Sequence, residues 1–121
     1  MNLPDYKKES SRTFANRTEP LDAKTTDLLH CAIGASTEAG ELLDAFKKHI
    51  FYGKPLDVVN VGEEIADMLW YLTNLARLTD LDVENLLQNN IDKLRKRFPE
   101  KFTQEGALNR DLEAERKELE K

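Results

Sequence analysis

The sequence is poor in cysteine, glycine and proline, and each scarcity narrows the class of protein. A single cysteine, Cys31, excludes a disulfide within the chain and favours a reducing, cytoplasmic location. Only 5 glycines and 4 prolines occur among 121 residues, which favours long helices over many short strands. No apolar run approaches the length of a membrane span, and the first residues lack the apolar stretch of a signal peptide. We therefore expect a cytoplasmic protein without membrane contact.

Basic residues are also fewer than acidic ones. The 18 lysines and arginines are outnumbered by 23 acidic residues, so the formal net charge is −5. Binding to nucleic acid depends on neutralising phosphates, and we therefore expect no nucleic-acid partner. A nucleotide ligand is not excluded, because a bound cation reverses the local field. With 40% hydrophobic residues, the composition is that of one globular domain spanning residues 1–121.

The hydrophobic pattern predicts an all-α fold. Apolar residues recur at helical spacing in three long segments, at about 24–49, 57–78 and 82–98. A shorter helix is expected within about 3–16, in an N-terminal region that includes a linker and ends near residue 20. The tail from about 103 to 121 is strongly charged and is predicted to be a solvated or frayed helix, or one that docks on a partner. The prediction is a four-to-five-helix antiparallel bundle.

Two pairs of acids give this bundle a candidate chemistry. Glu38 and Glu41 are three residues apart in one predicted helix, and Glu64 and Asp67 are three apart in the next. Residues at this spacing project from the same helix face, so two adjacent helices can bring four carboxylates together. Such a cluster needs a compensating cation, and oxygen ligands favour Mg²⁺, Mn²⁺ or Ca²⁺.

The residues around these acids bear on two competing interpretations. Cys31, Gly34 and Ala45 share the helical stripe of Glu38 and Glu41, and their small side chains leave room for a ligand or a close helix. Paired acids are nevertheless common on solvated helix faces. Spacing alone leaves the metal site and the solvated face equally open.

The combined motifs resemble those of the MazG-like nucleoside triphosphate pyrophosphohydrolases, in their short single-domain bacterial and phage form. The family pattern is Glu-x-x-Glu followed, after a spacer, by Glu-x-x-Asp. The resemblance extends through residues 36–42, 63–72 and 90–99 and into 102–115, and so covers most of the chain. It implies hydrolysis of a nucleoside triphosphate, NTP or dNTP, to a monophosphate and pyrophosphate with Mg²⁺, or Mn²⁺ in its place. It also implies an all-α fold completed by pairing into a homodimer or homotetramer.

The resemblance also implies roles for individual residues. Glu38, Glu41, Glu64 and Asp67 become metal ligands, and Glu63 becomes a fifth ligand or orients the attacking water. Tyr71, Asn90, Lys93 and Arg97 become substrate contacts, and Lys48 is a further candidate. The family usually has tyrosine at the position of Phe98, so a phenolic contact is not expected there.

Several alternatives remain open at this point. Without the resemblance, residues 93–97 are a solvated cationic run, and Asn90 suits a structural hydrogen bond as well as a ligand. Trp70 is expected in the core. A di-iron centre needs two Glu-x-x-His motifs, and only Asp27-Leu28-Leu29-His30 comes near one. An enzyme like phosphoribosyl-ATP pyrophosphatase and a non-catalytic helical interaction protein are the remaining rivals.

Overall fold

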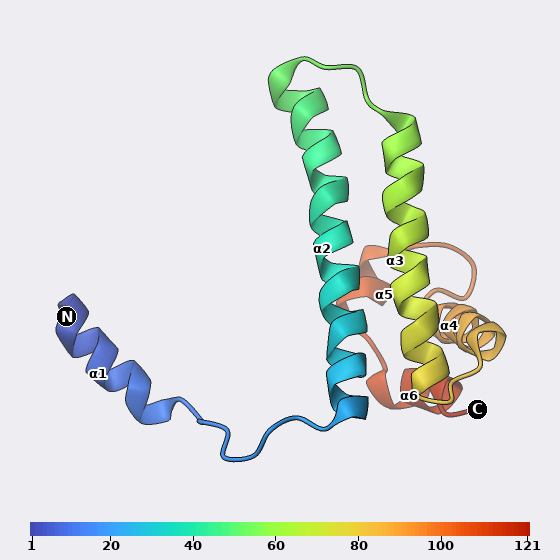
Figure 1. Ribbon diagram of the computed structural model, residues 1–121. Coiled ribbons are helices and arrows are strands. Elements are labelled where there is room, and N and C mark those ends of the chain that lie inside the picture. The colour runs from blue at the N-terminus through green and yellow to red at the C-terminus, as the bar shows by residue number, and fades with distance from the viewer.

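The computed structural model describes all 121 residues as six α-helices without a strand (Figure 1). The all-α prediction is confirmed. The helices are α1 (Leu3–Thr13), α2 (Ala23–Tyr52), α3 (Val58–Leu78), α4 (Val83–Arg97), α5 (Gln104–Leu108) and α6 (Leu112–Leu119). Their number exceeds the predicted four to five because the charged tail forms two short helices. None of the six is long and apolar enough to span a membrane.

Most helices begin at an aspartate whose side chain accepts a hydrogen bond from a first-turn backbone N–H. These N-caps are Asp22, Asp57, Asp82 and Asp111. Such caps satisfy amide groups that have no partner inside the helix, which explains why the helices start where they do. Gly53 ends α2 in the left-handed conformation, with φ 66°, a few residues beyond the predicted end.

The central feature is the antiparallel hairpin of α2 and α3, which pack against each other (Figure 1). The buried residues of α2 are Cys31, Gly34 and Ala45, as expected for a stripe of small side chains facing a neighbouring helix. The closest approach is at Gly34, where an added Cβ would overlap the ring of Tyr71. The hairpin therefore depends on small residues on α2 and on an aromatic ring from α3.

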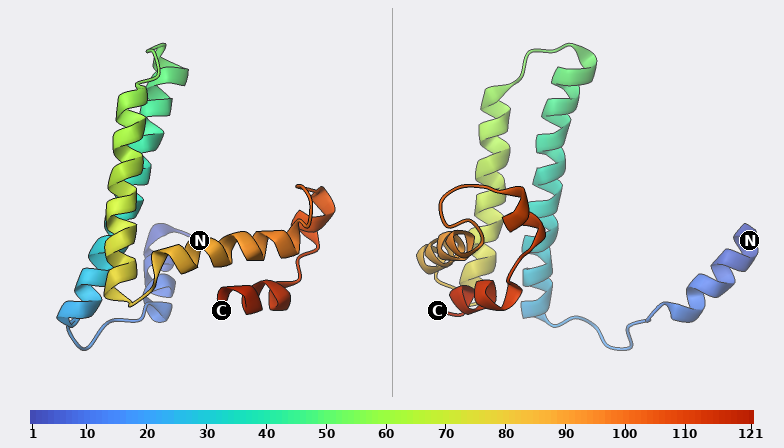
Figure 2. Two further views of the ribbon diagram at one scale, coloured as in Figure 1. Left: turned by 90° about the vertical axis from the view of Figure 1, so that its right-hand side faces the viewer. Right: turned by 180° about the vertical axis from the view of Figure 1, so that it is seen from behind.

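A second unit is formed by α4 and α6. α4 leaves the end of α3 and runs away from the hairpin, and α6 folds back along it (Figure 2). The contact is ionic: Glu115 of α6 accepts hydrogen bonds from Arg97 at 2.9 and 2.7 Å and from Arg110 at 3.3 and 2.6 Å. The tail is thus docked on its own chain and is not frayed, while its outer face, which carries Glu113 and Lys117, is exposed to solvent as expected.

Much apolar surface remains uncovered within one chain. The apolar face that periodicity predicts for α4 is largely exposed, because α4 does not pack on the hairpin. Its exposed residues are Val83, Leu86, Leu87 and Ile91, whereas Leu94 is half-buried. The expectation that Trp70 lies in the core is also wrong, since the residue is 60% exposed. The total accessible area is 10131 Å², whereas a compact monomer of 13.9 kDa exposes roughly 6,700 Å².

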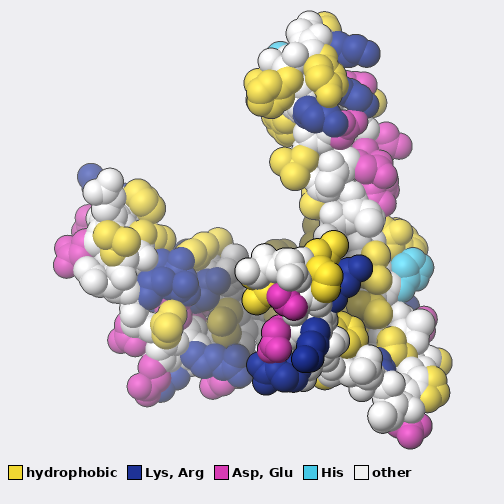
Figure 3. All heavy atoms as spheres, turned by 90° about the vertical axis from the view of Figure 1, so that its left-hand side faces the viewer, with side chains coloured by type: hydrophobic (Ala, Val, Ile, Leu, Met, Phe, Trp, Pro, Cys, Tyr) yellow, Lys and Arg dark blue, Asp and Glu magenta, His cyan; other side chains and the backbone are white.

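Hydrophobic side chains gather most visibly at the loop end of the hairpin, beside lysines (Figure 3). The exposed apolar residues there include Ile50, Phe51, Val58 and Val59. At the other end of the chain, α1 makes no extensive contact with another helix. Its apolar residues Leu3 and Tyr6 are exposed, and a helix this short is only marginally stable in isolation.

Candidate metal centre

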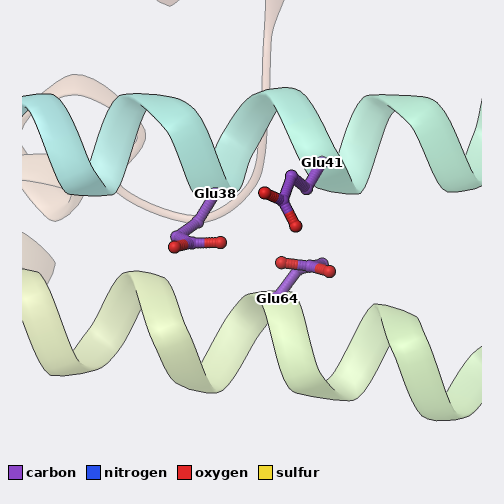
Figure 4. Close-up of side chains that lie close together, drawn as sticks. All are labelled: Glu38, Glu41 and Glu64. Atoms are coloured by element: carbon purple, nitrogen blue, oxygen red, sulfur yellow. The ribbon is translucent and has the colours of Figure 1, made fainter.

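Three carboxylates converge halfway along the hairpin. Glu38 and Glu41 project from α2 toward Glu64 on α3, and the three side chains point at one another (Figure 4). One oxygen from each lies within 4.8 Å of the others. The i, i+3 spacing on α2 and the close packing at the small-residue stripe together produce this convergence.

Glu64 is the most enclosed of the three, with 4% of its surface exposed. Its Oε1 accepts a hydrogen bond of 2.7 Å from the Nδ2 of Asn60, one turn earlier on α3. A buried carboxylate needs such a donor or a cation. Asn60 was missed in the sequence, although its position four residues before Glu64 was the available signal.

Glu38 shows the electrostatic strain of the cluster. Burial raises the pKa of its carboxyl, and hydrogen bonding with Glu64 and repulsion from Glu41, Asp67 and Glu64 raise it further. A raised pKa means that the negative form is disfavoured unless positive charge is supplied. The cluster therefore attracts either protons or a cation.

The remaining predicted ligands lie near the trio. Asp67 is exposed on the next turn of α3 and is close enough to raise the pKa of Glu38, although it is outside the group within 4.8 Å. Glu63 is also exposed. The structure thus brings together three of the four expected ligands, with the fourth beside them.

The donor set fits a hard divalent cation. All the donors are carboxylate oxygens, which suit Mg²⁺, Mn²⁺ and Ca²⁺ and offer no soft ligand for other metals. The cluster contains no histidine, so the Glu-x-x-His pattern of a di-iron site is missing. A bound cation would relieve the repulsion at Glu38 and would neutralise charge on a polyphosphate brought to the site.

Tyr71 lies on the same side of α3 as the acids, but its ring is occupied in packing. It covers Gly34 and makes edge contacts with Trp70 and His30, at centroid distances of 4.9 and 5.8 Å. The ring is half-buried between the two helices. Its position is therefore accounted for by the hairpin, independently of any substrate.

The predicted cations lie in two separate places. Lys48 is on α2, beyond the acids toward the loop, and pairs with Asp44 at 2.7 Å. Lys93 and Arg97 are on α4, together with Asn90, and this helix runs away from the hairpin (Figure 2). Arg97 is bound by Glu115, another residue that sequence reasoning missed. One chain alone therefore does not bring the residues of α4 to the carboxylates.

Asn90 has an exposed side chain and no hydrogen bond to the protein, whereas its neighbour Asn89 is the buried residue of α4. The structural hydrogen bond considered for Asn90 is thus not made within the chain.

Comparison with known proteins agrees with this geometry. Residues 28–102 match the model of the MazG nucleotide pyrophosphohydrolase domain, and this segment contains all the acids of the cluster. Neither the curated proteins nor the solved structures include a significant match. The matched segment covers more than half of the chain and comprises α2 from Leu28 onward, α3 and α4. The chain therefore belongs to the MazG nucleotide pyrophosphohydrolase family.

Proposed function

We propose that this protein hydrolyses a nucleoside triphosphate, NTP or dNTP, to the monophosphate and pyrophosphate, with Mg²⁺ or Mn²⁺ as cofactor. The observation that carries the proposal is the convergence of Glu38, Glu41 and Glu64 within 4.8 Å from two helices. Family membership supports nucleotide pyrophosphohydrolysis as the class of reaction. The role we assign is cleaning or regulation of the nucleotide pool in the cytoplasm.

In this proposal the acidic side chains bind the cation and orient the attacking water. Glu38, Glu41, Glu64 and Asp67 hold the cation, which supplies charge neutralisation for the triphosphate. Asn60 keeps Glu64 oriented through its 2.7 Å hydrogen bond. Glu63 lies next to this group and orients the attacking water, because a carboxylate there can accept a proton. No covalent intermediate with the protein is required.

We further propose that two or four chains assemble into the active unit. The excess accessible area and the exposed stripes on α3 and α4 need a cover of comparable apolar character. A second copy supplies such a cover, because its own stripes are equally exposed. Within one chain α4 does not reach the carboxylates, and in an assembly α4 of one chain can lie beside the carboxylates of another.

The test is a screen for pyrophosphate release over common and modified nucleoside triphosphates with Mg²⁺ or Mn²⁺. Glu41→Gln and Asp67→Asn are expected to lose most of the turnover and remain folded, since removing a carboxylate relieves repulsion. Glu84→Gln, an exposed acid at the start of α4, is the matched control and should retain activity. Unimpaired turnover in both site variants, or no release from any substrate by the wild type, would refute the proposal.

A further inference from the structure

A pocket of about 340 Å³ lies at the loop end of the hairpin, on the side of the carboxylates toward Gly53. It is lined by residues from the end of α2, the loop and the start of α3: Ala45, Lys48, Lys54, Pro55, Asp57 and Asn60. Four of these six residues carry a charged or polar side chain: Lys48, Lys54, Asp57 and Asn60. The pocket is therefore suited to a polar or charged ligand.

This pocket is linked to the carboxylate cluster through a shared residue, Asn60. Asn60 lines the pocket and at the same time donates to Glu64 Oε1 at 2.7 Å. On the other helix, Ala45 lies four residues after Glu41, a step of about one turn or ~5.4 Å along the axis. A ligand that is chemically extended, such as a polyphosphate, can thus touch both places.

The charges in the pocket favour an anion. It contains two ammonium groups and one carboxylate, and that carboxylate is already engaged: Asp57 accepts from the backbone N–H of Asn60 at 3.0 Å. Lys48 is paired with Asp44, whereas Lys54 forms no ion pair. The backbone at Lys54 is fixed because its carbonyl lies 2.8 Å from Nδ1 of His49. A free ammonium on an anchored loop is a suitable phosphate ligand.

We propose that this hairpin-end pocket binds the terminal phosphates of the substrate and the pyrophosphate product, with Lys54 as the principal cation and Lys48 as the second. The inference rests on the proposed function and assigns its phosphate-binding end. It gives the substrate a direction along the hairpin: the metal-held part lies at Glu38, Glu41 and Glu64, and the departing pyrophosphate lies toward the loop.

The test measures binding of inorganic pyrophosphate to the full chain by calorimetry, with Mg²⁺ and at fixed ionic strength. Lys54→Gln should weaken binding about tenfold, the effect of losing one charge-assisted hydrogen bond. Lys47→Gln is the matched control: it removes the adjacent lysine of α2, which lies outside this pocket and faces Asp44 and Tyr52. It should change the affinity less than twofold. Inorganic sulfate should bind much more weakly than pyrophosphate to the wild type.

Three binding results would overturn the assignment: no pyrophosphate binding by the wild type, a loss in Lys54→Gln no larger than that in Lys47→Gln, including no loss at all, or sulfate binding as tight as that of pyrophosphate. Circular dichroism of each variant checks that the helices are intact. The proposed function fails in a different way, through absent turnover in the wild type or unimpaired turnover in both Glu41→Gln and Asp67→Asn. Normal turnover with unchanged pyrophosphate affinity in Lys54→Gln would overturn the pocket alone.

Discussion

Gly34 offers the sharpest test of how the hairpin is held together. An alanine normally stabilises a helix interior by ~0.5–1 kcal/mol relative to glycine. At this position the new Cβ would overlap three ring carbons of Tyr71, far inside the ~3.5–4 Å at which carbon atoms make normal contact. Such overpacking costs ~1–3 kcal/mol. Displacing the ring also weakens its edge contacts with Trp70 and His30, each worth ~0.5–1.5 kcal/mol.

The sum predicts that Gly34→Ala lowers the free energy of unfolding by about 1–3 kcal/mol and the Tm by roughly 5–10 °C. Gly40→Ala and Gly62→Ala are the controls, because their added Cβ atoms meet nothing within 4 Å. Both should raise the Tm by a few degrees. Thermal unfolding followed by circular dichroism makes the comparison.

A double-mutant cycle isolates the cause of this difference. In a Tyr71→Ala background the penalty of Gly34→Ala should disappear, since the overlapping ring is gone. The reasoning is refuted if Gly34→Ala stabilises the protein as much as Gly40→Ala does. It is also refuted if the penalty survives without the tyrosine ring.

Two further perturbations test the ionic tail and the uncovered surface. The guanidinium groups of Arg97 and Arg110 hold the pKa of Glu115 well below its ordinary value of 4.5. The ion pairs therefore stabilise the folded protein fully above pH 4.5, and this stabilisation is lost as the pH falls through the lower pKa of the folded state. Near neutral pH, Glu115→Gln should therefore unfold at a lower temperature than the wild type and lose hydrogen-exchange protection in α6. This difference from the wild type should shrink below pH 4.5. The control is Glu113→Gln, an exposed position on the same helix, which should show neither effect. Leu69→Lys places a charge on the exposed face of α3 and should reduce the mass seen by sedimentation, and a wild type that sediments as a single chain would contradict the proposed assembly.

The sequence predicts the hairpin and its acids well because both depend on local rules. Aspartate caps mark helix starts, Gly53 marks an end, and the spacing of Glu38 and Glu41 places them on one face. The small-residue stripe of Cys31, Gly34 and Ala45 likewise predicts the close face of α2. These signals lie within a few turns of the residues that they position.

The unit formed by α4 and α6 could not be predicted in the same way. Periodicity shows that α4 has an apolar face, but it does not show what covers that face, and within one chain most of the face stays exposed. The docking of α6 depends on Glu115 meeting Arg97, 18 residues away, and on Arg110 arriving at the same carboxylate. No spacing rule specifies such a meeting. The exposure of Trp70 has the same origin, because tryptophan suits a core and a subunit contact equally well.

The four acids assigned to the metal all lie between positions 38 and 67, on two helices joined by a short loop. Contacts between residues that are close in sequence form quickly. The two helices can therefore pair, starting from the loop, before the rest of the chain is ordered. Mutual repulsion among the acids opposes that step at its midpoint. A cation that binds the closed pair and not the open chain would favour early closure. The element that is proposed to perform catalysis would then also be the one whose folding depends most directly on the proposed cation.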